Sequence, residues 1–211
     1  MSRPLRQQYP GATHHVMNRG AWRRNIFHDA ADRRLFLKLV GEAVDEFKLV
    51  IHAYCLMGNH FHLLTEVPKA NLDLAMHHVA SNYVRAFNKR HGGDGPMFRS
   101  RYTSLLIEHD RYFMAVARYI CRNPLAFGVD DLSIYPWSSM GAVVGNRPPQ
   151  RWLTIDEVLR RSGGADGFEA LVGGPFDGEL ERVLALKKIP SILGSPDFKA
   201  QVLGQPLRPA A

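Results

Sequence analysis

Two strand-like runs that lie close together in the chain constrain the fold most. Residues 49–56 and 60–67 are rich in β-branched, aromatic and aliphatic side chains, and only Met57-Gly58-Asn59 separates them. Short connections that contain Gly and Asn are typical of β-hairpins. The two runs therefore predict an antiparallel pair of strands.

The chain before this hairpin predicts a strand and a helix. Residues 11–20 end at Gly20 and form a pattern typical of a short strand, whose polar side chains can face a ligand. Between residues 29 and 48, apolar side chains recur at spacings of three and four residues. This spacing predicts an amphipathic helix capped by Asp29 or Asp32, with one face packed on a core.

After the hairpin, the chain again alternates between predicted helices and strands. The patterns predict a helix over 72–90 and a strand over 98–108. A third helix is expected to begin at Asp110, whose carboxylate can cap it, and to end near Asn123, because Pro124 disfavours helical geometry in the preceding residue.

This order of elements indicates an α+β sandwich, with an antiparallel sheet on one side and helices on the other. Residues 1–145 are expected to form one main domain. The composition then changes, and residues 146–211 are expected to form a small C-terminal helical appendage that ends in a disordered tail. Its expected helices lie near 155–161, 167–171 and 180–188, and the tail is expected over 203–211.

Charge and cysteine content narrow the class of protein. The chain has 27 Lys and Arg against 20 Asp and Glu, a formal net charge of +7, and a sequence pI near 9.6. This excess indicates an anionic partner, most simply nucleic acid, although ordinary variation can also produce it. Cys55 and Cys121 form no disulfide framework of the secreted kind, and no apolar run approaches membrane-spanning length. We therefore expect a soluble, cytoplasmic protein without a membrane partner.

Two histidines in the second strand of the hairpin are candidate metal ligands. Side chains two residues apart share one face of a strand, so His60 and His62 project together while Phe61 points the opposite way. Two imidazoles placed in this way can bind one cation. Glu66 lies farther along the same face as a weaker contributor. Histidines at this spacing are also common as solvated residues, so the pair alone does not decide between the two roles.

The helix from Asp110 carries a candidate nucleophile. Tyr119 and Asn123 lie one helical turn apart, so a phenol and an amide oxygen can enter one site together. A phenol with its ordinary pKa of about 10 needs a nearby cation or base to attack at neutral pH. Mixed His and Asn ligation suits Mg²⁺ or Mn²⁺, and Zn²⁺ is a less natural choice. The alternative is a tyrosine at the edge of the core and an asparagine that ends the helix.

Three motifs in register resemble the single-tyrosine HUH transposases, which are similar to insertion-sequence transposases, and especially their REP-associated branch. They are Ala53-Tyr-Cys-Leu-Met-Gly-Asn-His-Phe-His-Leu-Leu64, Arg118-Tyr-Ile-Cys-Arg-Asn-Pro124 and Tyr135-Pro-Trp-Ser-Ser139. The resemblance extends from about Tyr9 to Ser139. One departure is Gly58, where these proteins commonly have proline; it loosens the turn without altering the proposed ligands.

The resemblance implies a fold, a reaction and a substrate. The fold is a ferredoxin-like or RRM-like antiparallel sheet with helices packed on it. His60 and His62 would bind the ion, Asn123 would be the polar residue four positions after the tyrosine, and Tyr119 would attack single-stranded DNA. The products would be a 5′-phosphotyrosine link and a free 3′-hydroxyl group. Relatives in this branch act on repetitive palindromic elements, so hairpin DNA is the expected substrate.

Basic residues around these motifs are candidate phosphate contacts. They are Arg19, Arg23, Arg24, Arg85, Lys89, Arg90, Arg99 and Arg101. The aromatic residues among them, such as Trp22, Phe98 and Tyr102, could stack on unpaired bases.

Two other functions compete with the transposase. A non-catalytic module that binds single-stranded nucleic acid predicts binding that survives chelation. A metallohydrolase that uses water predicts no covalent protein–DNA species, but the chain has no dense set of Asp and Glu beside the histidines. The sequence is compatible with a monomer or a homodimer.

Overall fold

The sheet is built around the predicted hairpin. The computed structural model describes residues 7–175, 178–186 and 189–204. Strands β2 (Val50–Leu56) and β3 (His60–Val67) pair antiparallel across the short turn, as predicted. Strand β1 (Ala12–Arg19) pairs antiparallel with β3 on one side and with β4 (Thr103–Ile107) on the other. The short β5 (Ile192–Leu193) adds a parallel edge to β4, so the strand order is β2-β3-β1-β4-β5.

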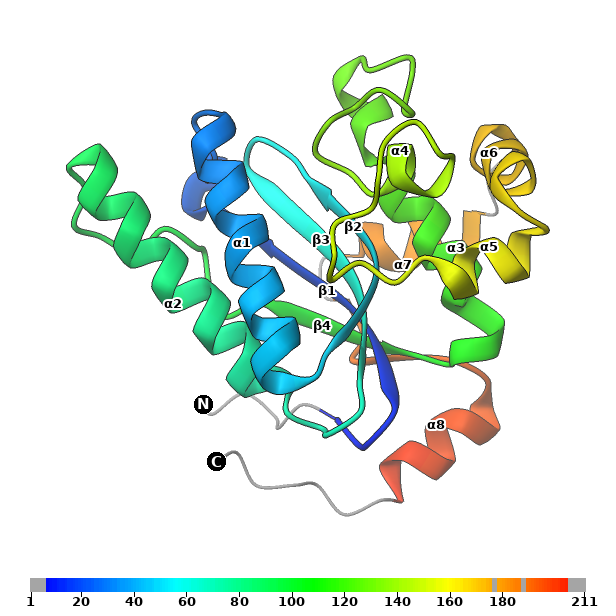
Figure 1. The fold of residues 1–211 in the computed structure, drawn as a ribbon. Coiled ribbons are helices and arrows are strands. Elements are labelled where there is room, and N and C mark those ends of the chain that lie inside the picture. Colours follow the sequence, from blue (N-terminus) through cyan, green and yellow to red (C-terminus); the bar gives the residue numbers. More distant parts are fainter. Residues whose placement is uncertain (1–6, 176–177, 187–188, 205–211) are drawn as a thin grey trace.

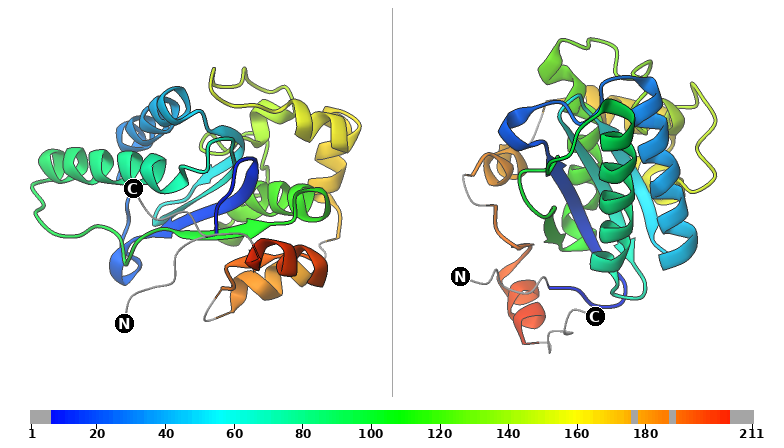
Figure 2. Two further views of the ribbon diagram at one scale, coloured as in Figure 1. Left: turned by 90° about the horizontal axis from the view of Figure 1, so that it is seen from below. Right: turned by 90° about the vertical axis from the view of Figure 1, so that its left-hand side faces the viewer.

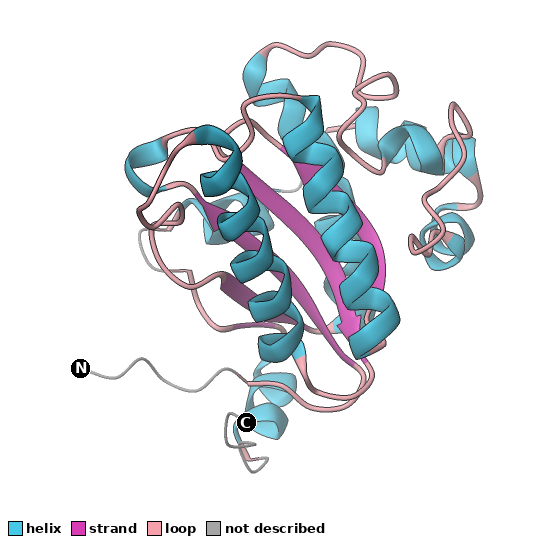
Figure 3. Ribbon diagram, turned by 60° about the vertical axis from the view of Figure 1, so that its left-hand side comes forward, coloured by secondary structure: helices cyan, strands magenta, loops and turns pink. Residues whose placement is uncertain are grey.

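Two long helices cover one face of the sheet. They are α1 (Ala30–Phe47) and α2 (Leu72–His91), which lie side by side across the strands (Figure 3). Phe61 of β3 points to this face and packs against Phe36 of α1, with ring centroids 4.7 Å apart. Asp29 caps α1 by accepting hydrogen bonds from the backbone N–H groups of Ala31 and Asp32, so the first of the two predicted caps is confirmed.

Helix α3 (His109–Arg122) covers the opposite face. Figure 1 shows α1 and α2 to the left of the strands and α3 to the right, and the left view of Figure 2 shows the strands between them. The predicted apolar stripe of α3 packs on Leu64 and Leu105 of the sheet; it consists of Phe113, Val116, Ala117 and Ile120. The α+β fold is therefore confirmed, but the expectation that all helices lie on one side of the sheet is wrong. Alternating side chains make both faces apolar, so each face needs a cover.

Two local predictions are also wrong. Helix α3 begins at His109 after Glu108, and neither Glu108 nor Asp110 caps it, because the Asp110 carboxylate accepts a hydrogen bond from Arg161 instead. The strand predicted over 98–108 is limited to Thr103–Ile107, and Phe98 makes only an isolated bridge to Gly20. The predicted end of α3 near Asn123 is confirmed, because α3 ends at Arg122 and the 3₁₀ helix η2 (Asn123–Phe127) follows; Asn123 itself keeps helical backbone angles.

The C-terminal third packs on α3 and on the edge of the sheet. Its helices are α4 (Met140–Val143), α5 (Asp156–Ser162), α6 (Ala165–Gly173), α7 (Gly178–Ala185) and α8 (Pro196–Leu203). Helices α5, α6 and α7 supply Val158, Phe168, Val172 and Leu180 to the core on the α3 side. The prediction that the disordered tail starts at Leu203 is wrong at that residue, because Leu203 is the last residue of α8. Residues 205–211 of the predicted tail lie outside the described residues. Among the described residues, no helix is long and apolar enough to span a membrane.

Candidate active site

His60 and His62 lie at the start of β3 on the face that α3 covers. Their ring centroids are 5.0 Å apart, as expected for side chains two residues apart in a strand. Residues paired across an antiparallel ladder share a face, so Arg19 of β1, opposite His60, also belongs to this face. His62 is buried and His60 is half-buried. The two rings are therefore held by the sheet rather than solvated.

The turn before β3 selects the tautomer of His60. The side-chain oxygen Oδ1 of Asn59 lies 2.6 Å from Nδ1 of His60. An amide oxygen can only accept a hydrogen bond, so Nδ1 of His60 carries the proton. The lone pair of the neutral ring is then on Nε2, where a cation can use it.

Tyr119 and Asn123 reach the histidines from the last turn of α3 and the start of η2. The Tyr119 ring packs edge-on against His62, with centroids 5.7 Å apart. The Asn123 side chain lies close enough to His60 and His62 to influence the pKa of both rings. Its Nδ2 donates to the backbone carbonyl of Tyr119 at 2.9 Å, so its oxygen Oδ1 is the side-chain atom that remains for a cation. The four residues singled out from the sequence therefore come together from two distant segments.

His15 of β1 is a fifth member of the site. Its Nε2 lies 2.9 Å from Nδ1 of His62, and its ring contacts Tyr119 with centroids 5.8 Å apart. His15 is fully buried, and its Nδ1 has no hydrogen-bond partner among the described residues. No specific role for His15 is predicted from the sequence. The available signal was the alternation of β1, which places one of two adjacent histidines on each face of the sheet.

Burial and a nearby cation keep the imidazoles neutral. Desolvation by burial, followed by the Arg19 charge, lowers the pKa of His60 to about 4. Burial also lowers the pKa of His62 well below its ordinary value, with further contributions from His15, His60 and Arg19. Burial lowers the pKa of His15 to about 3. Neutral rings can act as ligands and hydrogen-bond acceptors at neutral pH.

Glu66 lies away from these residues. It is at the far end of β3, where its Oε2 is 3.8 Å from Nε2 of the buried His52. The contact of the Glu66 carboxylate in the structure is therefore with His52 rather than with His60 or His62.

The predicted basic residues fall into two groups. The first lies on β1, on the turn after it and on the loop before β4; these segments are joined by hydrogen bonds from Ala21 N to Met97 O and from Arg99 N to Arg19 O. Its members are all exposed: Arg19, Arg23, Arg24, Arg99 and Arg101. The second group lies on α2 and consists of Arg85, Lys89 and Arg90. Arg90 is ion-paired with Asp29 and Asp32, so carboxylates already neutralise its charge.

The three aromatic residues named with them differ in exposure. Trp22 is 96% exposed, whereas Tyr102 is buried and Phe98 is half-buried against the core on the α1 and α2 side. Of the three, Trp22 is the side chain whose rings are available to a partner.

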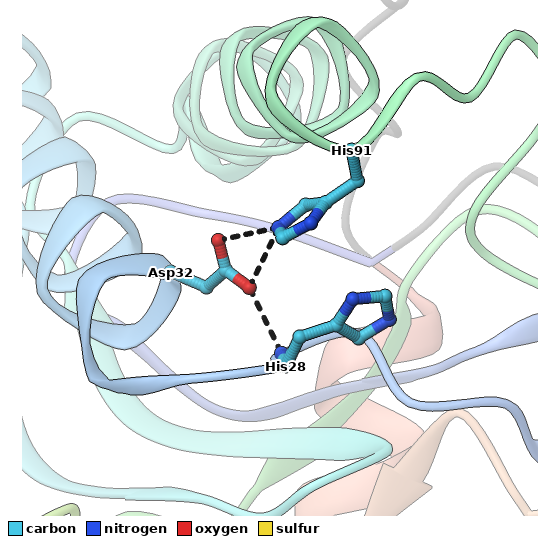
Figure 4. Close-up of side chains that lie close together, drawn as sticks. All are labelled: His28, Asp32 and His91. Carbon is cyan, nitrogen blue, oxygen red and sulfur yellow. Dashed lines mark hydrogen bonds and ion pairs between the residues drawn. The ribbon is translucent and has the colours of Figure 1, made fainter.

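A separate cluster of His28, Asp32 and His91 joins the start of α1 to the end of α2. The three residues offer ligand atoms within 4.8 Å of one another. The Asp32 carboxylate already accepts hydrogen bonds from the His28 backbone N–H and from His91 Nε2 (Figure 4). It also accepts one from Arg90. In Figure 4 the His28 ring points away from this carboxylate. A cation there would have to compete with Arg90, so the contacts indicate a structural connection.

We expect Asp32→Asn to destabilise the fold. Burial alone would raise the pKa of Asp32, but hydrogen bonds from His91, the His28 backbone and Arg90 outweigh it and lower this pKa. Loss of charged hydrogen bonds of this kind costs about 1.5–3 kcal/mol of unfolding free energy. A lowered carboxylate pKa stabilises the fold above the unfolded-state pKa of about 4, and this contribution is lost as the pH falls through the folded-state pKa.

Urea denaturation at about pH 7 and at several values below about pH 4 measures this effect. The matched control is Asp45→Asn, because Asp45 pairs with Arg151 on the surface and both side chains are exposed; we expect a change below about 1 kcal/mol. The difference between wild type and Asp32→Asn should shrink on acidification. Equal effects of the two substitutions at every pH would contradict the assigned role of Asp32.

Comparisons with known proteins agree with the fold described above. The chain is similar to a solved structure of a REP-associated tyrosine transposase bound to a REP hairpin, with 17% sequence identity and a TM-score of 0.58 over 74% of this chain and 90% of that chain. This likeness supports the fold. A putative transposase from Deinococcus radiodurans R1 is similar at 16% identity over 54% of this chain and 92% of that chain; its TM-score of 0.39 is too low to support an argument. No curated protein shows significant similarity.

The family comparison is more specific than these structural likenesses. The family model described as "Transposase IS200 like" matches residues 8–123, which make up more than half of the chain. The matched segment begins before β1 and ends at Asn123, so it contains all five residues that meet at the candidate site. The chain belongs to the IS200-like transposase family.

Proposed function

We propose that this transposase is a metal-dependent endonuclease and strand transferase for hairpin-forming single-stranded DNA, with Tyr119 as its nucleophile. The observation that carries the proposal is the convergence of Tyr119, Asn123 and the two histidines of β3 in one half-buried site. A nucleophile beside candidate cation ligands is the arrangement that phosphodiester transfer needs.

The proposed reaction exchanges one phosphodiester bond for another. The Tyr119 oxygen loses its proton and attacks phosphorus, and the bond from phosphorus to the 3′-oxygen breaks. That oxygen takes up a proton and leaves as a 3′-hydroxyl group, while the strand on the 3′ side of the break stays linked to Tyr119 through its 5′-phosphate. A 3′-hydroxyl can later attack this link and release the tyrosine, so no external energy source is needed.

His60, His62 and Asn123 have the donor chemistry to hold a divalent ion. Their candidate ligand atoms are two imidazole nitrogens and one amide oxygen, a mixed set that suits Mn²⁺ and tolerates Mg²⁺. When bound, the ion would polarise the phosphate and stabilise the negative charge that develops on it. Arg19, on the same face, can bind a phosphate oxygen next to the reacting one.

His15 serves in this proposal to orient His62. For His62 to offer its Nε2 lone pair, its Nδ1 must carry the proton and donate it to Nε2 of His15, 2.9 Å away. The neutral His15 ring can accept this hydrogen bond. Such partners fix the tautomer and the orientation of a metal-binding histidine.

We expect His15→Phe to weaken Mn²⁺ binding by about 10- to 100-fold, the usual cost of losing such a partner. The substitution keeps an aromatic ring against Tyr119 but removes the acceptor for His62. Electron paramagnetic resonance titration of free Mn²⁺ measures the affinity without relying on cleavage. The control is His14→Phe, because His14 neighbours His15, is also buried and hydrogen-bonds Ser104 on the other face of the sheet. A similar loss of affinity in both variants would contradict the orienting role.

We assign catalysis to residues 1–145 and a supporting role to residues 146–211. Arg118 and Arg122 flank the nucleophile on α3, and both donate hydrogen bonds to backbone carbonyls at the end of α6, including that of Gly174. The C-terminal segment thereby holds the helix that carries Tyr119. This support is compatible with a monomer or a homodimer.

Two observations favour hairpin DNA as the substrate. The REP-associated transposase that shares this fold is bound to a REP hairpin in its solved structure. In the present chain, five exposed arginines lie on β1, on the turn after it and on the loop before β4, and Arg19 is paired with His60 in the sheet. A group of this kind can neutralise the phosphates of a folded strand.

A gel assay with labelled DNA tests the proposal. The purified protein is incubated with hairpin oligonucleotides from palindromic repeats that flank its own gene, with Mg²⁺ or Mn²⁺, beside EDTA and fully duplex controls. We expect a shorter product and a slowly migrating covalent band on denaturing gels, both lost with EDTA. Cleavage without a covalent band would favour attack by water, and EDTA-resistant binding without any cleavage would favour a binding module.

A further inference from the structure

Trp22 is the most exposed large apolar side chain among the described residues. It is 96% exposed, compared with 70% for Ile134 and 64% for Leu203. The other two tryptophans, Trp137 and Trp152, pack against the core. A tryptophan so fully exposed to water has both faces of its ring system accessible to a partner.

The two residues before Trp22 are held by backbone hydrogen bonds to two other segments. Gly20 N donates to Asn59 O at 2.9 Å, and Ala21 N donates to Met97 O at 2.8 Å. A Cβ atom at Gly20 would lie 2.1 Å from the carbonyl oxygen of Arg24, so this close turn requires glycine. The backbone next to Trp22 is therefore held in place, which is favourable for a side chain that binds a partner.

The backbone of this turn is also in an unfavourable conformation. Trp22 has φ 56° and ψ 24°, and Arg23 has φ 61°, so two consecutive residues with side chains adopt the left-handed region. This region is costly for residues other than glycine. Left-handed residues of this type are concentrated at functional sites, where the surrounding structure holds them.

The surroundings of Trp22 are cationic. The segments 18–27 and 95–107 meet at the turn through hydrogen bonds, and they contain five arginines and no acidic residue. An exposed aromatic ring among arginines is the combination that binds single-stranded nucleic acid, in which cations contact phosphates and the ring stacks on a base. An apolar protein partner would leave these cations unpaired.

Asn59 connects this turn to the active site. Its Nδ2 donates to the backbone carbonyl of Arg23 at 3.1 Å, and its Oδ1 lies 2.6 Å from Nδ1 of His60. One side chain therefore touches both the residue after Trp22 and a proposed metal ligand. DNA that reaches the site from this side must pass the turn.

We infer that Trp22 stacks on an unpaired base in the single-stranded segment beside the phosphate that Tyr119 attacks. The inference rests on the proposed function, because that function sets the position of the phosphate at Tyr119. It adds a platform that recognises an unpaired base next to the hairpin, whereas the arginines bind phosphates of any strand. Stacking tolerates every base, so we expect discrimination between unpaired and paired nucleotides more than between sequences.

Binding without catalysis tests this inference. The Tyr119→Phe protein in EDTA is titrated by fluorescence anisotropy with a hairpin that carries a single-stranded tail and with the same hairpin without a tail. Trp22→Ala should weaken binding of the tailed hairpin by roughly 5- to 150-fold, the loss typical of one base–aromatic stack. Binding of the blunt hairpin should not change. Trp22→Phe should retain most of the affinity, and Ile134→Ala is the control for loss of an exposed apolar side chain.

An abasic scan along the tail locates the base. One abasic position should weaken binding to the parent protein and have no further effect on Trp22→Ala. Equal affinities of the parent and Trp22→Ala, equal losses on both hairpins, or no binding by the parent would overturn the inference. If the parent protein were a dimer and Trp22→Ala a monomer that still binds the tail, Trp22 would contact a second copy of the chain and not DNA, which would also overturn the inference. The assay contains no nucleophile and no metal, so failure of the proposed catalysis would leave its result unaffected.

Discussion

Replacement of Tyr119 by Phe is expected to abolish both cleavage and the covalent protein–DNA species. The variant lacks the oxygen that forms the bond to phosphorus but keeps the ring that packs against His15 and His62. Loss of a nucleophile typically lowers the rate by at least about 10⁴-fold. The thermal midpoint and the affinity for hairpin DNA should stay close to the wild-type values, because the side chain is only half-buried.

The matched control is Tyr112→Phe. Tyr112 lies on the same helix, two turns before Tyr119, and its hydroxyl donates to Glu179 at 2.9 Å, away from the histidines. This variant should cleave at close to the wild-type rate. If Tyr119→Phe cleaved as fast as Tyr112→Phe, the phenol of Tyr119 would not be the nucleophile, and attack by water would become the better account.

Removal of His62 is expected to have the second largest effect. His62→Ala deletes a proposed ligand and also the group that His15 orients. We expect loss of measurable Mn²⁺ binding and a fall in cleavage rate of at least about 10³-fold, because a bound ion contributes several kcal/mol to stabilisation of the transition state. Hairpin binding in EDTA should persist, since the exposed arginines remain.

Two further variants separate this effect from misfolding. His62→Gln keeps a polar group in the buried position, so it should melt closer to the wild type yet still lose Mn²⁺ binding. His78→Ala removes a histidine on α2 that contacts Glu42 and Glu46 and should leave both metal binding and cleavage unchanged. Normal Mn²⁺ affinity in a folded His62→Gln protein would contradict the ligand role.

The local parts of this site are predictable from the sequence. A three-residue turn with Gly and Asn sets the hairpin, and alternation along β3 places His60 and His62 on one face. Helical spacing brings Tyr119 and Asn123 together, and the position of Pro124 predicts the end of the helix to within one residue. Each of these features depends on neighbours fewer than ten residues away.

The remaining features depend on contacts between distant segments. The hydrogen bond between His15 and His62 follows from the pairing of β1 with β3, which periodicity alone does not reveal. Asp110 is a residue type that often caps helices, but its carboxylate instead accepts a hydrogen bond from Arg161, 51 residues later. Likewise the sequence predicts that Arg90 contacts phosphate, whereas in the structure Arg90 forms ion pairs with Asp29 and Asp32. Tertiary partners outweigh local preference in each case.

Location of the covalent adduct tests the central claim most directly. The wild-type protein is trapped with a hairpin oligonucleotide in the presence of Mn²⁺, the DNA is digested to a short remnant, and the protein is mapped by peptide mass spectrometry. The proposed mechanism predicts a 5′-phosphonucleotide on Tyr119, the first residue of the sequence Tyr119-Ile-Cys-Arg122. An adduct on another residue such as Tyr112, or cleaved DNA with no adduct on the protein, would contradict it.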